Sequence, residues 1–305
     1  MKEYDAVVVG GGPAGATAAL YLVRSGVNVA MVEKLSGGGQ MLKTDEIENY
    51  PGFPDGIRGW ELADKFTAHL DHYEFDKFMD EVREIKLGKH HEMLIGDEWI
   101  RTKTIILCTG AEYRKLGVPG ESRLTGRGVS YCALCDGNFY RDRDVVVVGG
   151  GNSALEESLY LARLVNKIHL VHRRDDFRGL QCYQDKCFIN PKINVIRSSV
   201  VTEIVGENEV TGVEIENLNT GEKSVIEADG AFVFVGFVPV MEYVPEEVER
   251  DRNGLKVDLE MATSVPGVFA AGDIISKSCR QVATAVGDGA TAATSAFAYL
   301  EQMDA

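Results

Sequence analysis

The sequence is poor in positive charge and has no long apolar run. Lys and Arg number 32 against 47 Asp and Glu, which gives a formal net charge of −15. A chain this acidic repels phosphate backbones and anionic lipid, so neither nucleic acid nor a membrane surface is an expected partner. No apolar run approaches the roughly 18 residues that a membrane span needs. Glycines and a proline at 10–13 also break the one segment, 6–22, that resembles a targeting sequence, so we expect a cytoplasmic protein.

Cysteine is scarce as well, with six in 305 residues. Cysteines so few and so scattered do not make the disulfide framework of a secreted domain, which favours a reducing compartment. Cys182 and Cys187 have no His or Cys partners at metal-binding spacing, and no metal is predicted. Cys108 and Cys279 also lie in no pattern that indicates a function.

The other two cysteines, Cys132 and Cys135, form a CxxC motif with Asp136 directly after it. This spacing lets two thiols close a small disulfide ring, and a nearby helix N-terminus or positive group can lower the pKa of one of them. A pair of this kind is typical of electron exchange rather than of fold stabilisation. The motif therefore predicts redox chemistry.

A glycine-rich turn occurs twice, 139 positions apart. The first turn follows the apolar segment 7–9 and the second follows the predicted strand 145–148, and the helix expected after each turn repeats the letters LYL at 20–22 and 159–161. In each βαβ unit the glycines let the backbone approach a pyrophosphate, and the helix N-terminus offers free N–H groups. Two such turns in register predict two dinucleotide sites. The turn residues are Gly10, Gly12, Pro13, Ala14 and Gly15 in the first copy and Gly149, Gly151, Asn152, Ser153 and Ala154 in the second.

The two copies differ where their second strand ends. Glu33 and Lys34 stand in the first copy where the second has His172 and Arg173. An acid at that place accepts hydrogen bonds from the hydroxyls of an unphosphorylated ribose, whereas guanidinium groups suit a 2′-phosphate. The second copy is thus predicted to bind NADPH, unless its cationic run is only a solvated surface patch. That run contains His172, Arg173, Arg174 and Arg178.

The first copy is expected to hold FAD rather than NAD, because three further segments suit a flavin. Glycines at 37–39 let the backbone lie against a flat ring, although they also fit a flexible loop. The predicted strand 265–271 leads through Gly272 to Asp273, whose carboxylate can accept hydrogen bonds from ribityl or ribose hydroxyls. The helix expected after 280–283 can stabilise negative charge on a reduced ring, unless it is a core helix without cofactor contact. The residues concerned are Gly39, Gln40, Gly272, Asp273, Arg280, Gln281 and Val282.

Residues of the first site lie near both ends of the chain, so its domain is expected to be discontinuous. Gly and Pro cluster at 117–120, and prolines recur between 239 and 245, which favours domain boundaries there. Short predicted strands at 200–205, 212–216 and 231–235 complete the inserted unit. The predicted fold class is α/β, with two Rossmann-like nucleotide-binding domains of three layers each, ordered β, β, α. Residues 1–115 and 244–305 are predicted to form the FAD domain, and residues 116–243 the inserted NADPH domain with the CxxC motif.

With these motifs together, the chain resembles the low-molecular-weight thioredoxin reductases, which are class-II pyridine nucleotide-disulfide oxidoreductases. The resemblance spans nearly the whole length and includes Asn49 in the segment 48–52, which is similar to a family segment whose Asn contacts flavin. It implies that NADPH reduces FAD, that FAD reduces the disulfide of Cys132 and Cys135, and that these thiols reduce thioredoxin or a similar protein. By the same resemblance Cys135 is the thiol beside the flavin and Cys132 the thiol that attacks the partner.

The resemblance also implies a homodimer and a rotation between the two domains. It implies that Asp136 is the acid that takes up and releases protons. Apolar neighbours would raise the pKa of Asp136 and so support this role. An Asp at this position can instead cap the next turn. Leu134 and Val282 depart from the usual family residues without removing a chemical group that the mechanism needs. Three alternatives stay open: ferredoxin or a deazaflavin as electron donor, a redox-sensing nucleotide-binding regulator, and an NADPH oxidase that reduces oxygen at the flavin.

Overall fold

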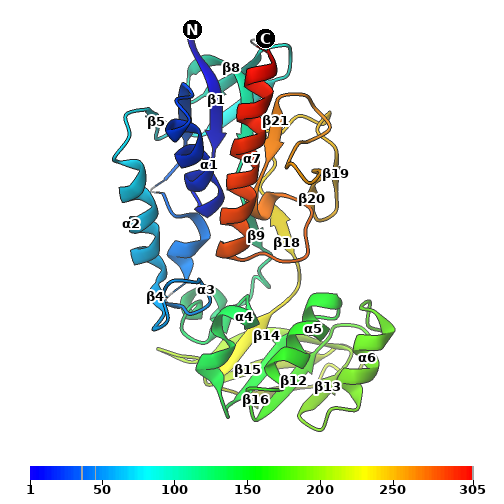
Figure 1. Ribbon diagram of the computed structural model, residues 1–305. Coiled ribbons are helices and arrows are strands. Elements are labelled where there is room, and N and C mark those ends of the chain that lie inside the picture. Colours follow the sequence, from blue (N-terminus) through cyan, green and yellow to red (C-terminus); the bar gives the residue numbers. More distant parts are fainter. Residues whose placement is uncertain (36, 45, 304–305) are drawn as a thin grey trace. The chain divides into compact units, whose positions relative to one another are not determined.

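The computed structural model describes residues 1–35, 37–44 and 46–303, which fold into two compact units (Figure 1). Unit 1 comprises Met1–Glu112 and Val238–Ala305, and unit 2, Tyr113–Phe237, is inserted within it. The chain passes between them at two strands that pair with each other, β9 (Ala111–Tyr113) and β18 (Phe237–Pro239). The boundaries expected after 115 and 243 lie a few residues beyond these two strands.

Unit 1 is built on a sheet with the strand order β5-β2-β1-β8-β7-β6, to which β21 adds beside β8. Strand β1 pairs in parallel with β2 and β8, whereas β6, β7 and β8 form an antiparallel meander. Successive β1 side chains enter different cores: Val7 and Val9 face one, while Ala6 and Val8 face the other. This alternation explains why residues 6–9 of the strand are all apolar, since a parallel strand is buried on both faces. The elements of unit 1 besides β9 and β18 are β1 (Lys2–Val9), α1 (Pro13–Arg24), β2 (Val29–Val32), η1 (Gly39–Lys43), β3 (Glu46–Ile47), β4 (Ile57–Arg58), α2 (Gly59–Leu70), β5 (Asp76–Phe78), β6 (Val82–Lys86), β7 (His91–Ile95), β8 (Glu98–Leu107), β19 (Arg250–Asp251), β20 (Gly254–Leu255), β21 (Val268–Ala270), η3 (Gly272–Ile274) and α7 (Val282–Met303).

Helices α1 and α7 lie side by side over one face of this sheet (Figure 1). The contact depends on small residues, because a Cβ at Gly289 of α7 would lie 2.2 Å from the carbonyl oxygen of Ala14 in α1. Ala292 and Ala296 continue the buried face of α7. Since α1 begins at Pro13, this packing also holds the end of the first glycine turn.

Unit 2 has a parallel sheet in the order β10-β17-β11-β12-β13. Val146 and Val148 of β11 pack under an antiparallel sheet of β14, β15 and β16, while Val145 and Val147 pack under helices on the opposite face. The layers are thus β, β, α, and the predicted fold class is confirmed. Strand β16 was not predicted, because most of its side chains are exposed and lack an apolar alternation. The elements of unit 2 are α3 (Glu121–Leu124), β10 (Val129–Ser130), α4 (Ala133–Asp136), η2 (Gly137–Tyr140), β11 (Asp144–Val148), α5 (Asn152–Leu161), β12 (Lys167–Val171), α6 (Gln181–Phe188), β13 (Ile193–Ile196), β14 (Ser199–Val205), β15 (Gly212–Asn217), β16 (Lys223–Glu227) and β17 (Gly230–Val233).

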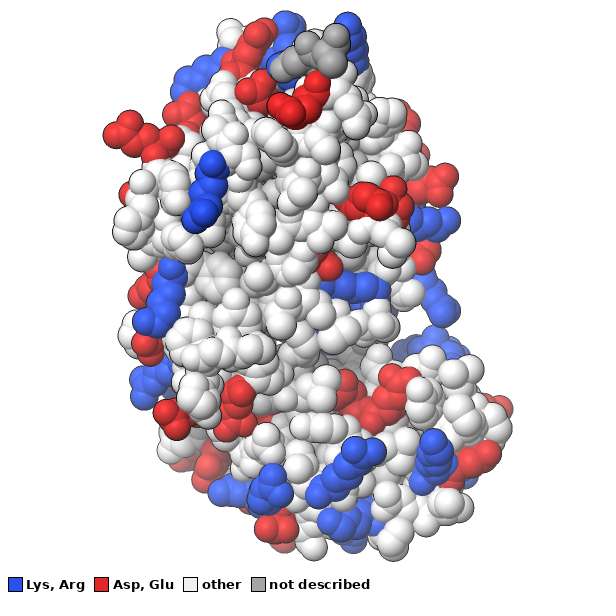
Figure 2. All heavy atoms as spheres, viewed as in Figure 1, with Lys and Arg blue, Asp and Glu red and all other residues white. Residues whose placement is uncertain are grey.

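The surface carries both signs of charge. Among the residues drawn in Figure 2, acidic and basic side chains intermingle, and neither sign forms a continuous area on the face shown. No helix within the described ranges is long and apolar enough to cross a membrane.

Candidate functional site

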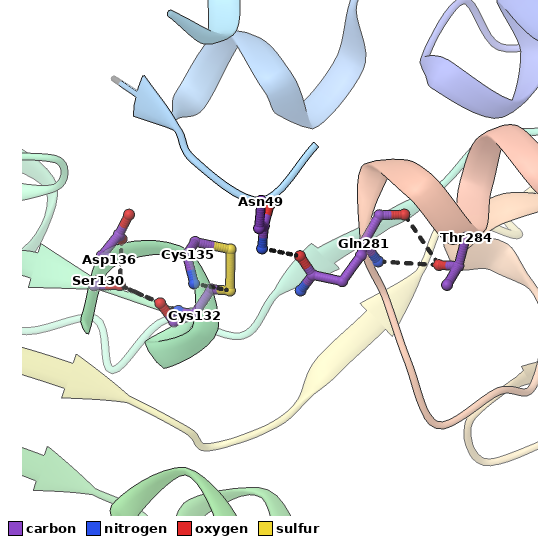
Figure 3. Close-up of a disulfide and its surroundings, with 7 residues drawn as sticks. All are labelled: Asn49, Ser130, Cys132, Cys135, Asp136, Gln281 and Thr284. Atoms are coloured by element: carbon purple, nitrogen blue, oxygen red, sulfur yellow. Dashed lines mark hydrogen bonds between the residues drawn. A yellow bond between two sulfur atoms is a disulfide. The ribbon is translucent and has the colours of Figure 1, made fainter. Parts of the chain in front are cut away.

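Cys132 and Cys135 of the CxxC motif form a disulfide, with their Cα atoms 5.3 Å apart (Figure 3). Cys132 is the N-cap of the short helix α4, and its Sγ accepts the backbone N–H of Cys135 with an N···S distance of 3.1 Å. A backbone N–H that donates to the sulfur stabilises a thiolate at Cys132. The local structure therefore favours thiol exchange at Cys132.

Asp136 ends α4 and points its carboxyl back toward the segment before the disulfide. Its Oδ2 accepts the hydroxyl of Ser130 at 2.5 Å, and the same hydroxyl oxygen accepts the backbone N–H of Cys132 at 3.1 Å (Figure 3). The Asp136 side chain makes no capping bond to η2, so the capping alternative is not supported. Burial, and then the charge of Asp136, raise the pKa of Tyr140 to about 12, so an aromatic ring does lie near the carboxyl. A hydrogen-bonded path thus joins this acid to the backbone of Cys132.

The first glycine turn follows β1 and leads into α1. Gly10 has a φ of +105°, and a Cβ there would lie 2.3 Å from the carbonyl oxygen of Cys108, so only glycine fits. A Cβ at Gly15 would lie 1.8 Å from the oxygen of Gly10. Gly12 caps α1 without a side-chain bond, which leaves the N–H groups of the first turn available for an anion.

The second turn repeats this geometry in unit 2. Gly149 has a φ of +153°, and a Cβ there would lie 2.5 Å from the carbonyl oxygen of Phe234. Gly151 caps α5 without a side-chain bond, and a Cβ on it would meet open space. Asn152, the first residue of α5, accepts the N–H of Leu180 at 2.8 Å and so ties the turn to the segment after β12.

Glu33 follows β2 and points its carboxyl toward the first turn. Its Oε2 accepts the N–H of Gly11 at 2.6 Å, and its Oε1 accepts the N–H of Leu35 at 3.0 Å. Each oxygen has a further lone pair, so the acid can still accept bonds from ribose hydroxyls. Lys34 does not join it: its Nζ lies 2.6 Å from an oxygen of Glu81 in an exposed ion pair.

The cationic run folds back over the second turn. The backbone N–H groups of Arg178 and Gly179 both donate to the oxygen of Gly150. His172 is buried beneath the turn, where a Cβ on Gly150 would lie 2.2 Å from its ring. Burial lowers the pKa of His172, and the charges of Arg178, Arg173 and Arg174 lower it further.

The three arginines of this run are exposed. Within the described part of the chain, Arg173, Arg174 and Arg178 form no ion pair with a carboxylate, although acids separate them in the sequence. Asp175 instead accepts the hydroxyl of Ser198. Guanidinium groups that gather at a glycine turn without acidic partners suit a phosphate.

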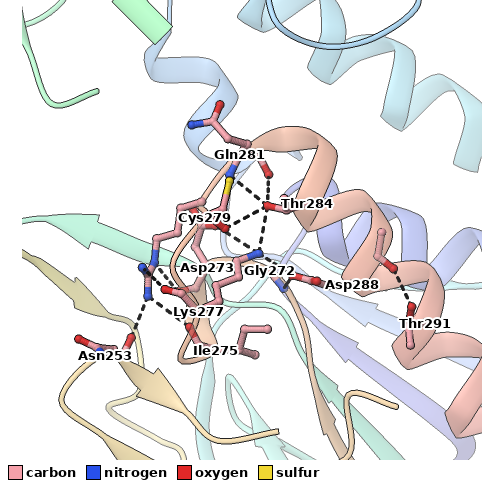
Figure 4. Close-up of polar contacts among 12 residues, drawn as sticks. Asn253, Gly272, Asp273, Ile275, Lys277, Cys279, Gln281, Thr284, Asp288 and Thr291 are labelled. Atoms are coloured by element: carbon pink, nitrogen blue, oxygen red, sulfur yellow. Dashed lines mark hydrogen bonds and ion pairs between the residues drawn. The ribbon is translucent and has the colours of Figure 1, made fainter. Parts of the chain in front are cut away.

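The segment between β21 and α7 contains Gly272 and Asp273 (Figure 4). Oδ1 of Asp273 is buried and, among the described residues, accepts no hydrogen bond, while Nζ of Lys277 lies 4.0 Å away. Burial raises the pKa of Asp273, and the charges of Lys277 and Arg280 offset this in part. A buried acceptor of this kind calls for a donor that the chain itself does not supply. The guanidinium of Arg280 organises the segment by donating to backbone oxygens of Asn253, Asp273, Ile275 and Lys277.

Other residues predicted at the first site also lie in unit 1. Nδ2 of Asn49 donates to Oε1 of Gln281 at 3.0 Å, which joins two segments far apart in the sequence (Figure 3). Gln40 donates to the oxygen of Ala111 at 3.0 Å. Gly39 has a φ of +56°, and a Cβ there would lie 3.2 Å from the Cα of Gly12, so this glycine packs against the first turn. Val282 begins α7.

The sequence and the fold are similar to those of known proteins. A model of the pyridine nucleotide-disulphide oxidoreductases matches residues 4–289. The chain belongs to this family. It is similar to the thioredoxin reductase of Listeria monocytogenes, with 43% identity over 99% of this chain and 95% of that protein, and to that of Bacillus subtilis, with 41% identity over 99% and 96%. The crystal structure of thioredoxin reductase from Streptococcus pyogenes superposes with a TM-score of 0.93 at 46% identity, covering 98% of this chain and 99% of that one.

Membership of the pyridine nucleotide-disulphide oxidoreductases implies a flavin and a pyridine nucleotide as cofactors. The residues present fit both groups. Each glycine turn leaves a helix N-terminus without a side-chain cap, as a pyrophosphate needs. The buried, unsatisfied oxygen of Asp273 fits a hydroxyl donor of a bound cofactor, and the arginines at the second turn fit a phosphate.

Sequence reasoning missed several residues that organise the site. Ser130 binds Asp136, but a lone Ser in a two-residue strand carries no recognisable signal. Asp288 accepts the N–H of Gly272 and pairs with Lys277 at 2.5 Å. The signal that could have identified Asp288 is an acid in the first two turns of a helix that is otherwise rich in Ala and Gly.

The remaining cysteines are free. Cys108 and Cys187 are buried, and burial raises the pKa of the Cys187 thiol to about 11 and that of the Cys108 thiol further. Cys182 and Cys279 are exposed. Across the described residues, His, Cys, Asp and Glu side chains form no group of three or more that could hold a metal ion.

Proposed function

We propose that the chain is an NADPH-dependent thioredoxin-disulfide reductase. The observation that carries the proposal is the Cys132–Cys135 disulfide at a helix N-terminus, in the same unit as a glycine turn that three arginines flank. The three relatives described above are all thioredoxin reductases, which supports the same activity here.

FAD is assigned to unit 1 and NADPH to unit 2. When bound, FAD accepts a hydride from NADPH and supplies two electrons that open the disulfide. Glu33 and Asp273 would accept hydrogen bonds from cofactor hydroxyls, and the first glycine turn would bind the pyrophosphate. The second turn would bind the NADPH pyrophosphate, and Arg173, Arg174 and Arg178 would bind its 2′-phosphate.

The protein's own groups manage charge and protons at the disulfide. Opening it requires two protons, one for each sulfur that becomes a thiol. Cys132 is assigned as the attacking thiol, because the N–H of Cys135 would stabilise its thiolate. Cys135 then displaces the reduced partner and closes the ring again. We assign to Asp136 the delivery of a proton to the opened disulfide, and its Oδ2, beside the hydroxyl of Ser130, can hold that proton.

The partner is expected to be thioredoxin or a thioredoxin-like protein, and the functional form a homodimer in the cytoplasm. A dithiol that works by exchange needs a disulfide acceptor on another protein. Four cysteines that stay free in the structure fit a reducing compartment.

Replacement of single cysteines tests the proposal. In Cys132→Ser and Cys135→Ser variants, NADPH should still bleach the flavin absorbance, while reduction of a thioredoxin disulfide should stop. Cys182→Ser is the matched control, because Cys182 is exposed and unbonded, and it should keep full turnover. Thioredoxin reduction that persists in both CxxC variants would remove the hypothesis.

Ferredoxin and a deazaflavin are less well supported as electron donors, because neither would explain the arginines at the second glycine turn. A redox-sensing regulator would consume one equivalent of NADPH without steady turnover. An NADPH oxidase would be indifferent to loss of the cysteines. Steady-state NADPH consumption with and without thioredoxin distinguishes all of these from the proposed activity.

A further inference from the structure

The ammonium group of Lys277 lies between two carboxylates of unit 1 (Figure 4). Its Nζ is 2.5 Å from Oδ2 of Asp288 in α7 and 4.0 Å from Oδ1 of Asp273 in η3. The side chains of Lys277 and Asp288 are only 14% and 16% exposed, so solvent and salt screen this pair little. One cation therefore faces two acids in a mostly buried place.

The two acids differ in the donors that they bind. Oδ2 of Asp288 accepts both Nζ of Lys277 and the backbone N–H of Gly272, the latter at 3.2 Å. Nζ of Lys277 also donates to the hydroxyl of Thr284 at 3.3 Å. Oδ1 of Asp273 is buried and accepts no hydrogen bond from any described residue. Asp288 thus holds the cation, while Asp273 keeps an open acceptor.

Lys277 is placed to occupy that open acceptor. An ammonium on a flexible stem has three donors, and the described contacts of Lys277 use two of them. A shift of about 1 Å would bring its Nζ from 4.0 Å to hydrogen-bonding distance of Asp273 Oδ1. A direct pair would then fill the oxygen that a cofactor hydroxyl needs. The bond from Lys277 to Asp288 opposes this shift.

Arg280 is the other cation near Asp273. Burial raises the pKa of Asp273, the charges of Lys277 and then Arg280 lower it, and the charge of Asp288 raises it. The guanidinium of Arg280 donates to four backbone oxygens, which fix its place. Lys277 is therefore the nearby cation that an acidic side chain holds.

We propose that Asp288 is a positioning residue for the flavin site: it retains the ammonium of Lys277 and so keeps Oδ1 of Asp273 open for a hydroxyl donor of the bound cofactor. This inference rests on the proposed function, in which unit 1 binds FAD. Asp288 acts through Lys277, and Asp273 is the residue that would contact the cofactor.

Removal of the Asp288 charge tests the inference. In Asp288→Asn, pairing of Lys277 with Asp273 should deprive the cofactor of a hydrogen bond to a charged group and raise the Kd for FAD about 10–100-fold. Serial dilution of the FAD-loaded full-length protein, with released FAD read by its fluorescence, measures this Kd. Glu301→Gln is the matched control, because it removes the same charge from an exposed position of the same helix, and its Kd should not change.

A second substitution distinguishes competition from a simple loss of structure. Addition of Lys277→Met to Asp288→Asn removes the competing cation, so the Kd should return to within about threefold of the parent value. Lost structural contacts predict the opposite, because the double variant lacks both members of the ion pair. General electrostatics also predicts the opposite at both steps: FAD has an anionic pyrophosphate, so loss of an acid should strengthen its binding and loss of a lysine should weaken it.

An unchanged or lower Kd in Asp288→Asn would overturn the proposal. A double variant that binds FAD no more tightly than Asp288→Asn would overturn it as well. If Asp288→Asn does not fold, Asp288→Ser, which also removes the charge, takes its place in both measurements. A parent protein that retains no FAD would contradict the proposed function itself, so the two failures are distinguishable.

Discussion

Replacement of Gly289 by alanine tests the close packing that supports the first glycine turn. A Cβ at Gly289 would lie 2.2 Å from the carbonyl oxygen of Ala14 and 3.0 Å from its carbon. These are backbone atoms of α1 and cannot rotate away, so the two helices must separate by about 1 Å to restore a van der Waals contact. Overpacking of this kind typically costs about 1–3 kcal/mol.

Part of that cost is recovered, because alanine favours a helix over glycine by roughly 0.5–1 kcal/mol. The net loss in free energy of unfolding should be about 1–2 kcal/mol, and for a domain of this size each kcal/mol lowers Tm by about 2–4 °C. Gly287→Ala is the control. No atom lies within 4 Å of a Cβ at Gly287, which is exposed in the same helix, so this variant should gain stability.

Differential scanning calorimetry at a fixed flavin concentration measures both variants, since bound cofactor itself shifts Tm. Gly289→Ala should melt roughly 2–8 °C below the parent and should lose flavin on gel filtration, because α1 begins directly after the turn. Gly287→Ala should melt slightly above it. A Gly289→Ala protein that melts at or above the parent would contradict the packing of α1 against α7.

Three further predictions concern unit 2. Arg173→Ala combined with Arg174→Ala should raise KM for NADPH roughly 10–100-fold, as expected for lost charge-assisted bonds, and leave KM for NADH nearly unchanged; the exposed Arg163→Ala is the control, and equal effects on both nucleotides would contradict the phosphate assignment. Asp136→Asn should slow thioredoxin reduction by about 10²-fold with little effect on flavin reduction by NADPH, as loss of a general acid does; an unchanged rate of thioredoxin reduction would exclude Asp136 as the proton carrier. The folded-state pKa of His172 is lowered, so the unfolded state binds more protons just below pH 6.5 and stability should fall as pH drops below about 6.5. Urea unfolding of His172→Gln should show a weaker loss over that range, and an identical pH dependence would refute this linkage.

The core of each unit and the redox pair are predictable from the sequence, because the signals are local. The apolar strands around β1 and β11 and the glycine turns after them depend on neighbouring residues, and spacing alone lets Cys132 and Cys135 close a ring. The internal repeat adds long-range information, since two copies in register predict two similar folds.

Contacts between distant side chains are not predictable in this way. Lys34 follows Glu33 directly, yet it pairs with Glu81 on the surface instead of joining the turn. Glu157 follows Glu156 in α5, and two successive acids in a helix indicate only a solvated face, yet the Oε2 atom of Glu157 is buried. Nothing local distinguishes it from Glu156, because the difference arises from how α5 packs against α4.

In the proposed function, electrons from NADPH reach the Cys132–Cys135 disulfide by way of a flavin. An anaerobic titration of the FAD-loaded protein with NADPH, with the flavin spectrum recorded and free thiols trapped at each step, measures this directly. We expect the Cys132 and Cys135 peptides to become alkylated together, with two thiols for each NADPH oxidised, before the flavin stays bleached. A protein that binds no flavin, or a disulfide that remains closed under excess NADPH, would contradict it.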